Sequence, residues 1–470
     1  MSLNNFFLIL LIKSILFSYS KFEIPFKVGN YKHEKGEKEF ILDYFYKDIA
    51  VNISIGTPWQ KITLAACLGE YNTFVISKNC QNYDKGKYNE LKSDTYKPIE
   101  KSQYFTFEIF SNGTLAKESI SFDNNKIENY QFINALEIGD SCYDAYCEVL
   151  TQPGILGFLI QPHANAEMDF SGYNLINQLK KRDLISRYDF YFDFDSNDTG
   201  KIIIGSLPNE TNPELYNNTD YSFFSVSKVD FSLDWAFIFD EIYYGEEKLY
   251  FDLKKVNILR IEFGFIKGSF DMEEYVKKDF FEPLINSSKC FRKSTSEIGT
   301  SIYYYYCDKD IDLNNFKPWK FTINEFEMNF TFTKDDLFLD IGDKYIFLMC
   351  FGGSPVIYLG YPFLKKYKFI FNQDSKTLGY LFESNGTVGP RGKEKEKEKE
   401  IVKKEKFKTI YIVLICVLSA ILIGLGIFIY FFLKKKKKKL ASELSEQPET
   451  QNNNEGLIPN EESKDRKSVV

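Results

Sequence analysis

The residues with the most reactive side chains lie in a motif that occurs twice. An apolar stretch leads into one glycine loop at 67–69 and into another at 262–264. Farther along the chain, each loop is followed by two apolar residues and a glycine, in GILGF (154–158) and VIYLG (356–360). The first loop offers a thiol, which can act as a nucleophile, and the second a carboxylate, which can act as a general acid or base. The repeat predicts two homologous halves.

Histidine is too scarce to support the commonest reactions of a cysteine. A nucleophilic thiol needs a nearby base, and the only histidines are His33, in a charged stretch, and His163, after a predicted turn. A buried or disulfide-linked role is therefore favoured for Cys67. The same scarcity argues against a Ser-His-Asp triad and a His-rich metal site, and neither a metal nor a cofactor is expected. The net charge of −7 argues against a nucleic-acid partner.

The elements that must position these loops are mostly strands. Short runs of alternating polarity, such as DIAVNISIG (48–56) and KFTINEFEMNFTF (320–332), are separated by Asn, Asp and Gly turns. Helical patterns are few, and the clearest span residues 171–186 and 271–285. This pattern predicts the all-β class, in the form of a sandwich, a barrel or a protein of two β lobes.

Four segments resemble the pepsin family of aspartic proteases, in the family's order. They are SIGTPWQKITLAACLGEYNTFVISKNC (54–80), GILGF (154–158), NILRIEFGFIKGSFDMEEY (257–275) and VIYLGYPFLKKYKFIFNQDSKTLGYL (356–381). The resemblance covers roughly residues 45–385. It implies a bilobal fold, with two homologous β lobes and a cleft between them that holds an extended peptide.

The resemblance also implies what the two loops should carry. Enzymes of this family use two carboxylates that share one proton, because two like charges so close cannot both ionise. Alignment on Gly69 places Cys67 at the first aspartate, and alignment on Gly264 places Glu262 at the second. The flanking hydroxyl positions are also lost, to Leu68, Glu70, Phe263 and Phe265. A thiol stays mostly protonated in acid, and a longer carboxylate is displaced by about 1 Å, so both catalytic positions are predicted to be non-functional.

Other family positions are altered as well. The hairpin at 105–122 resembles the flap that closes over substrate, with Phe110 in place of the family's Tyr and Phe74 in place of its partner Trp. Gly69, Gly264 and Phe110 are the residues expected to line the substrate site. A literal Asp-Thr-Gly at 198–200 follows a polar turn, and it is predicted to belong to a hairpin rather than to the active site.

The two ends of the chain predict a membrane anchor. Phe6 to Phe17 is an apolar run followed by small residues, as in a secretory signal, with an uncleaved anchor as the alternative. Ile410 to Leu433 has no charge and is long enough to cross a bilayer, and six lysines follow it. The expected order is a signal peptide (1–20), an N-terminal segment or residual propeptide (21–45), an N-terminal lobe (46–205), a C-terminal lobe (206–388), a charged stalk (389–408), a transmembrane helix (409–433) and a cytoplasmic tail (434–470).

The predicted body would lie outside the cytosol, in a single-pass type I membrane protein. Glycosylation sequons are confined to this part, and Asn52, within a predicted strand, is expected to be unmodified. The remaining acceptors are Asn112, Asn197, Asn209, Asn217, Asn286, Asn329 and Asn385. Oxidising surroundings favour disulfides. By resemblance Cys307 pairs with Cys350, while Cys142 and Cys147 span a short loop and can also pair.

Three functions remain open from the sequence. The first is an inactive pseudoprotease, with a cleft that holds an extended peptide or protein or serves a structural role. The second is a working endopeptidase that uses Glu262 with a partner such as Glu70. The third is a surface adhesion or structural protein, in which the bulk of Phe263 and Phe265 fills the cleft.

Overall fold

A computed structural model represents the chain, and its described residues belong to one compact unit within residues 1–392. The described residues are 21–30, 44, 47–81, 86–105, 110–123, 125–138, 152–160, 173–195, 199–211, 221–225, 235–250, 256–261, 263–295, 301–324, 328–353 and 356–381. The predicted signal, stalk, membrane span and tail lie outside them. Within them, no helix is long and apolar enough to cross a membrane.

Strands dominate the described part of the chain, which confirms the mostly β prediction. One sheet has the order β11-β26-β25-β9-β10-β1-β2-β3-β8-β4-β7-β6-β5. Its strands are β1 (Phe22–Asn30), β2 (Lys47–Ile55), β3 (Gln60–Cys67), β4 (Thr73–Gln81), β5 (Lys97–Phe105), β6 (Phe110–Phe122), β7 (Asn125–Ile138), β8 (Gly154–Gly157), β9 (Asp189–Phe194), β10 (Thr199–Ile204), β11 (Tyr221–Ser225), β25 (Phe369–Asn372) and β26 (Thr377–Leu381).

Two further sheets form most of the second half. The larger has the order β12-β15-β24-β16-β23-β18-β22-β21, with β17 paired to β18, and the smaller has the order β14-β13-β19-β20. Their strands are β12 (Ala236–Ile238), β13 (Glu241–Tyr244), β14 (Glu247–Lys248), β15 (Val256–Leu259), β16 (Ile266–Ser269), β17 (Cys290–Thr295), β18 (Ile302–Asp308), β19 (Trp319–Ile323), β20 (Met328–Phe332), β21 (Phe338–Asp340), β22 (Lys344–Phe347), β23 (Met349–Gly352) and β24 (Val356–Leu359).

The helices fall where the helical patterns predicted them. The pattern at 171–186 contains α3 (Leu175–Lys181), whose first turn is capped by Asn174. The pattern at 271–285 forms a continuous run of α5 (Phe270–Val276), η5 (Lys277–Phe281) and α6 (Glu282–Asn286). Shorter helical elements are η3 (Glu90–Lys92), α4 (Pro208–Thr211), η6 (Leu313–Asn315), α7 (Lys334–Leu337) and α8 (Tyr361–Lys366).

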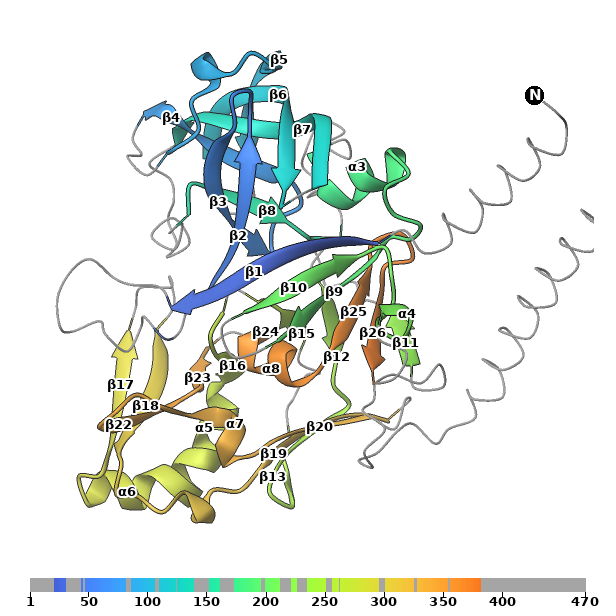
Figure 1. The fold of residues 1–470 in the computed structure, drawn as a ribbon. Helices are drawn as coiled ribbons and strands as arrows, with labels where there is room; N and C mark the ends of the chain where they lie inside the picture. Colours follow the sequence, from blue (N-terminus) through green and yellow to red (C-terminus); the bar gives the residue numbers. More distant parts are fainter. Residues whose placement is uncertain are drawn as a thin grey trace, which may run out of the picture. The chain divides into compact units, whose positions relative to one another are not determined.

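Strand β1 lies in the middle of the large sheet, and it comes from the stretch predicted to be an N-terminal segment or residual propeptide. It crosses the middle of the fold between β10 and β2 (Figure 1). Its alternate side chains are buried, with Phe26 packed edge-on against Phe192 and Phe194. Because both edges of β1 are hydrogen-bonded, this strand is an interior part of the sheet.

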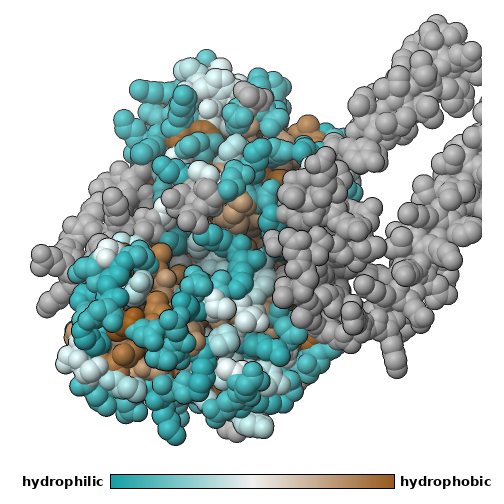
Figure 2. All heavy atoms as spheres, turned by 60° about the horizontal axis from the view of Figure 1, so that its bottom comes forward, coloured by the Kyte–Doolittle hydropathy of each residue, from teal (hydrophilic) through white to brown (hydrophobic). Residues whose placement is uncertain are grey.

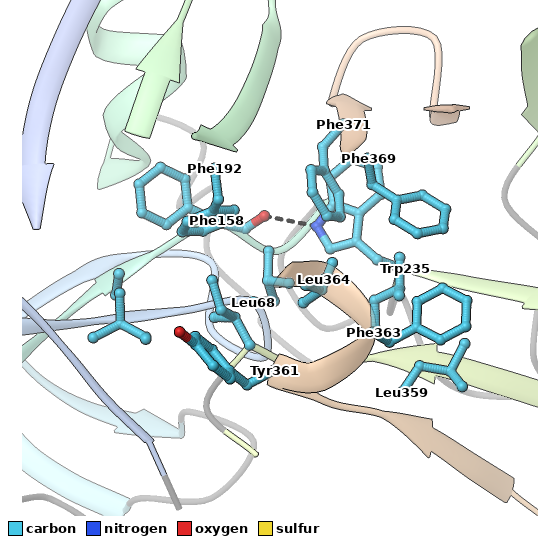
Figure 3. Close-up of a cluster of buried hydrophobic side chains, with 14 of the residues drawn as sticks. Leu68, Phe158, Phe192, Trp235, Leu359, Tyr361, Phe363, Leu364, Phe369 and Phe371 are labelled. Atoms are coloured by element: carbon cyan, nitrogen blue, oxygen red, sulfur yellow. Dashed lines mark hydrogen bonds between the residues drawn. The ribbon is translucent and has the colours of Figure 1, made fainter. Parts of the chain in front are cut away.

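One hydrophobic core runs beneath both halves. It gathers Leu68 from the first half with Trp235 and Phe371, and Figure 3 shows these side chains converging. The Trp235 Nε1 donates to the Phe158 carbonyl oxygen at 2.8 Å, so the buried indole is satisfied across the two halves. On the face in Figure 2, the described surface is largely hydrophilic with small apolar patches, as is ordinary for a folded domain.

The predicted Cys307–Cys350 disulfide is wrong, because Cys307 pairs with Cys290 instead. Cys290 and Cys307 stand directly opposite each other on β17 and β18. Cys350 lies on β23, where its neighbour Phe351 faces Tyr303. That register puts Cys350 three residues along from Cys307, roughly 10 Å, which is beyond the reach of a disulfide. Cys350 is a buried free thiol.

Candidate active site

The first glycine loop is built around strand β8. Strand β3 arrives parallel to β8, with Ala66 opposite Leu156. The chain turns after Cys67, and β4 leaves antiparallel to β8, with Thr73 opposite the same Leu156. Strand β8 therefore runs between the two arms of the loop.

The second glycine loop repeats this arrangement around strand β24. Strand β15 arrives parallel to β24, with Leu259 opposite Leu359. Strand β16 then leaves antiparallel, with Ile266 opposite the same Leu359. The two halves thus share one motif, as the repeated sequence pattern predicted.

The glycine at the end of each threaded strand is required by space. A Cβ on Gly157 would lie 2.6 Å from the backbone oxygens of both Asn72 and Glu70. A Cβ on Gly360 would collide with the backbone oxygens of Phe263 and Phe265. The loop backbone closes directly over each glycine, which explains why two apolar residues and a glycine recur in both halves.

The strand registers correct the sequence alignment of the second loop. Ala66 and Leu259 hold equivalent places, as do Thr73 and Ile266, and both loops have the same length between these points. The residue equivalent to Cys67 is therefore Arg260, and the alignment on Gly264 was displaced by two residues. A single glycine is a weak anchor for an alignment, whereas paired strands allow one register. Glu262 lies outside the described residues.

Glu70 is a buried carboxylate in the first loop. Its Oε1 accepts the backbone N–H groups of Tyr71 at 2.8 Å and Asn72 at 3.1 Å. Burial raises the pKa of Glu70 to about 7, against the opposing effect of these hydrogen bonds and of the Arg260 charge. The field of Arg260 thus reaches from the second loop to a carboxylate of the first. The sequence pointed to Glu70 as the replacement of a hydroxyl residue and as a possible partner of Glu262. It did not point to Arg260.

Arg260 brings a permanent charge into the interior. It is buried, and its backbone N–H donates to the Leu359 carbonyl oxygen at 3.0 Å. A guanidinium does not lose its proton in proteins. At the loop start where the first half has the half-buried thiol of Cys67, the second half therefore has a cation.

Aromatic rings occupy the rest of the second loop. Phe263 and Phe265 are buried and stacked, with ring centroids 5.3 Å apart. Tyr358 on β24 meets Phe263 edge-on at 5.4 Å. Tyr44, from the segment before β2, packs against the same cluster. The large side chains of Phe263 and Phe265 are thus packed into the interior.

The other predicted site residues are scattered along the fold. Phe74 is buried on β4, and Phe110 begins β6 opposite Phe105. Gly69 lies in the turn between β3 and β4, and Gly264 lies between Phe263 and Phe265. Thr199 and Gly200 begin β10, which pairs with β9 as the predicted hairpin.

The predicted glycosylation sites lie in different settings. Asn286 is exposed at the end of α6, and Asn329 is half-buried on β20. Asn112 lies on β6 opposite Gln103, and Asn209 lies in α4. The remaining sites, Asn197, Asn217 and Asn385, lie outside the described residues, and modification stays a prediction at all of them.

A mostly β chain with two such loops around threaded strands has the architecture of an aspartic protease. The family model "Eukaryotic aspartyl protease" matches residues 48–381, and the chain belongs to this family. A search of the curated proteins found no match.

Proposed function

We propose that this protein is a membrane-anchored, catalytically inactive aspartyl protease relative that retains a cleft for an extended peptide. The observation that carries the proposal is the equivalence of Cys67 and Arg260, given by the strand registers. The family's mechanism needs a carboxylate at both places. Here one place holds a thiol and the other a guanidinium.

With Cys67 and Arg260 at these two places, both the acid–base chemistry and the geometry of the carboxylate pair are lost. In the family, one carboxylate activates water and the other protonates the scissile carbonyl. Arg260 cannot accept a proton, and its charge opposes the build-up of positive charge beside it. Glu70 is the one carboxylate of the described loop residues, and its Oε1 is already committed to two backbone N–H groups.

The runner-up is an endopeptidase with an altered pair, Glu262 and Glu70. It is favoured by one observation: a pKa of about 7 lets Glu70 carry a proton in mildly acidic solution. In such an enzyme, Glu70→Gln and Glu262→Gln would each abolish turnover.

An activity assay separates these two functions. The full-length chain in detergent is incubated with a mixed peptide library from pH 3 to 7, and products are identified by mass spectrometry. We expect no cleavage. Turnover that disappears in both Glu70→Gln and Glu262→Gln would overturn the proposal. An exposed substitution, Glu247→Gln, controls for contaminating protease.

A structural role in which the cleft is filled is supported by the buried Phe263 and Phe265 rings. The same library distinguishes it, because a retained cleft should enrich a defined extended sequence on the immobilised full-length chain. The absence of any enriched sequence would favour the filled, structural form.

The membrane anchor and the luminal body complete the proposal. They rest on the apolar run at 410–433, the lysines after it and the sequons before it. In microsomes, the body should be protected from added protease. Treatment with a glycosidase should make the chain migrate faster on a denaturing gel. A chain that alkaline carbonate releases from the membrane would contradict the anchor.

A further inference from the structure

The buried ammonium of Lys267 has no role in the fold described so far. Lys267 lies on β16 and is 6% exposed. Its neighbour Ile266 faces the main core, so Lys267 points to the opposite face of the sheet. On that face it stands opposite Cys350 on β23 and Tyr358 on β24.

Lys267 differs from Glu273 and Asp189, two buried charges that each form an ion pair. Glu273 accepts the Arg292 Nε at 2.7 Å, and Asp189 accepts the Arg187 Nε at 2.6 Å. No described carboxylate pairs with Lys267, whose Nζ lies 5.3 Å from the Tyr358 ring centroid. Burial lowers the pKa of Lys267, and the Cys350 thiol opposes that shift. A buried cation without an anion is costly, so a fold that retains one has a use for it.

The position of Lys267 in the motif connects it to the loops. Phe74 stands opposite Ile155 on β8, and Lys267 stands opposite Tyr358 on β24, so the two are equivalent in the two halves. The face that Lys267 shares is also the one occupied by the loop rings Phe263 and Phe265. A hydrophobic side chain in the first half is thus matched by a cation in the second.

We propose that Lys267 receives an acidic side chain of a peptide bound between the halves. This inference rests on the proposed peptide-binding function and specifies its ligand: an extended segment with Asp or Glu between apolar residues. The ammonium would pair with the carboxylate, and Tyr358 would contact the apolar flanks. Half-exposed Tyr306 and Leu348 pack on the same cluster, and so bring it to the surface. A desolvated charge pair of this kind favours one partner strongly over its neutral counterpart.

Three fluorescent eight-residue peptides test the inference. They are identical except for a central Glu, Gln or Lys between two leucines. Binding to the full-length chain in detergent is measured by anisotropy at neutral pH. We expect the Glu peptide to bind about tenfold or more tightly than the Gln peptide, and the Lys peptide to bind most weakly.

Two lysine variants locate the effect. Lys267→Met removes the buried charge while keeping its length, and should make the Glu and Gln peptides equal. Lys320→Met is the matched control, because the Lys320 Nζ also lies over a tyrosine, 5.2 Å from the Tyr243 ring centroid, on the separate sheet of β19. It should leave the preference unchanged.

Each outcome bears on a different statement. Equal binding of the Glu and Gln peptides to the unmodified chain, or a preference that survives Lys267→Met, overturns the acidic ligand but leaves peptide binding intact. Failure of all three peptides, together with a library that enriches no sequence, overturns both. The comparison on the unmodified chain decides the question even if Lys267→Met does not fold.

Discussion

The two loops share a backbone and differ in nearly every side chain. Both close over a glycine of the strand that they surround, Gly157 in the first half and Gly360 in the second. The first loop then offers a thiol and a buried carboxylate, whereas the second offers a guanidinium and two stacked rings. The comparison shows that both loops keep the threaded glycine, while the side chains around it differ.

The largest expected effect is on the shared backbone. Gly157→Ala and Gly360→Ala both place a Cβ into backbone oxygens that cannot move aside, and each should cost about 4 kcal/mol or more of unfolding free energy. Gly29→Ala is the control, since its Cβ would meet nothing closer than 3.8 Å. Urea unfolding measures all three. If one half tolerated its alanine, the two loops would not be structural equivalents.

The next effect distinguishes the loops by their charge. The pKa of Glu70 is raised from its ordinary 4.5 to about 7, so the folded state holds the proton more tightly than the unfolded state. The raised pKa adds roughly 3 kcal/mol to the unfolding free energy below pH 4.5. This contribution is lost as the pH rises to 7. Glu70→Gln should remove that loss. Urea unfolding from pH 4.5 to 8 tests it, and an unchanged slope would show that Glu70 is not buried.

The second half should depend on its disulfide. Cys290→Ser breaks the bond to Cys307, which spans 17 residues, and should cost about 3 kcal/mol. Cys350→Ser leaves that bond intact and should cost less. Thermal unfolding compares them, and peptide mapping without reduction identifies the bond. A Cys307–Cys350 peptide would restore the pairing that family resemblance implied.

The smallest effect sharpens the contact between the loops. Arg260→Met removes the cation that holds down the pKa of Glu70. That pKa should rise, which extends the loss of stability to higher pH. The same unfolding series measures it, with Lys126→Met as the control on an exposed ion pair. If the pH dependence of the unfolding free energy did not shift, Arg260 would have no electrostatic effect on Glu70.

Particular residues show how far sequence reasoning reaches. Alternating runs predicted the strands because periodicity is local, and the recurrence of GILGF and VIYLG predicted two homologous halves because a repeat is visible in the sequence itself. The patterns at 171–186 and 271–285 predicted the helices for the same reason. The second loop was misaligned because its single glycine does not specify register.

The sequence by itself determined the class of the fold and the repeat, and it predicted that Cys67 replaces the first catalytic aspartate. Only the tertiary structure decided that Arg260 is its counterpart, that Cys290 pairs with Cys307 and that Glu70 and Lys267 are buried. These features arise from strands far apart in the chain that meet in one register. Where such strands pair, the distances between residues, their burial and their electrostatic environment are properties of the packed molecule. They cannot be read from the local pattern of the sequence.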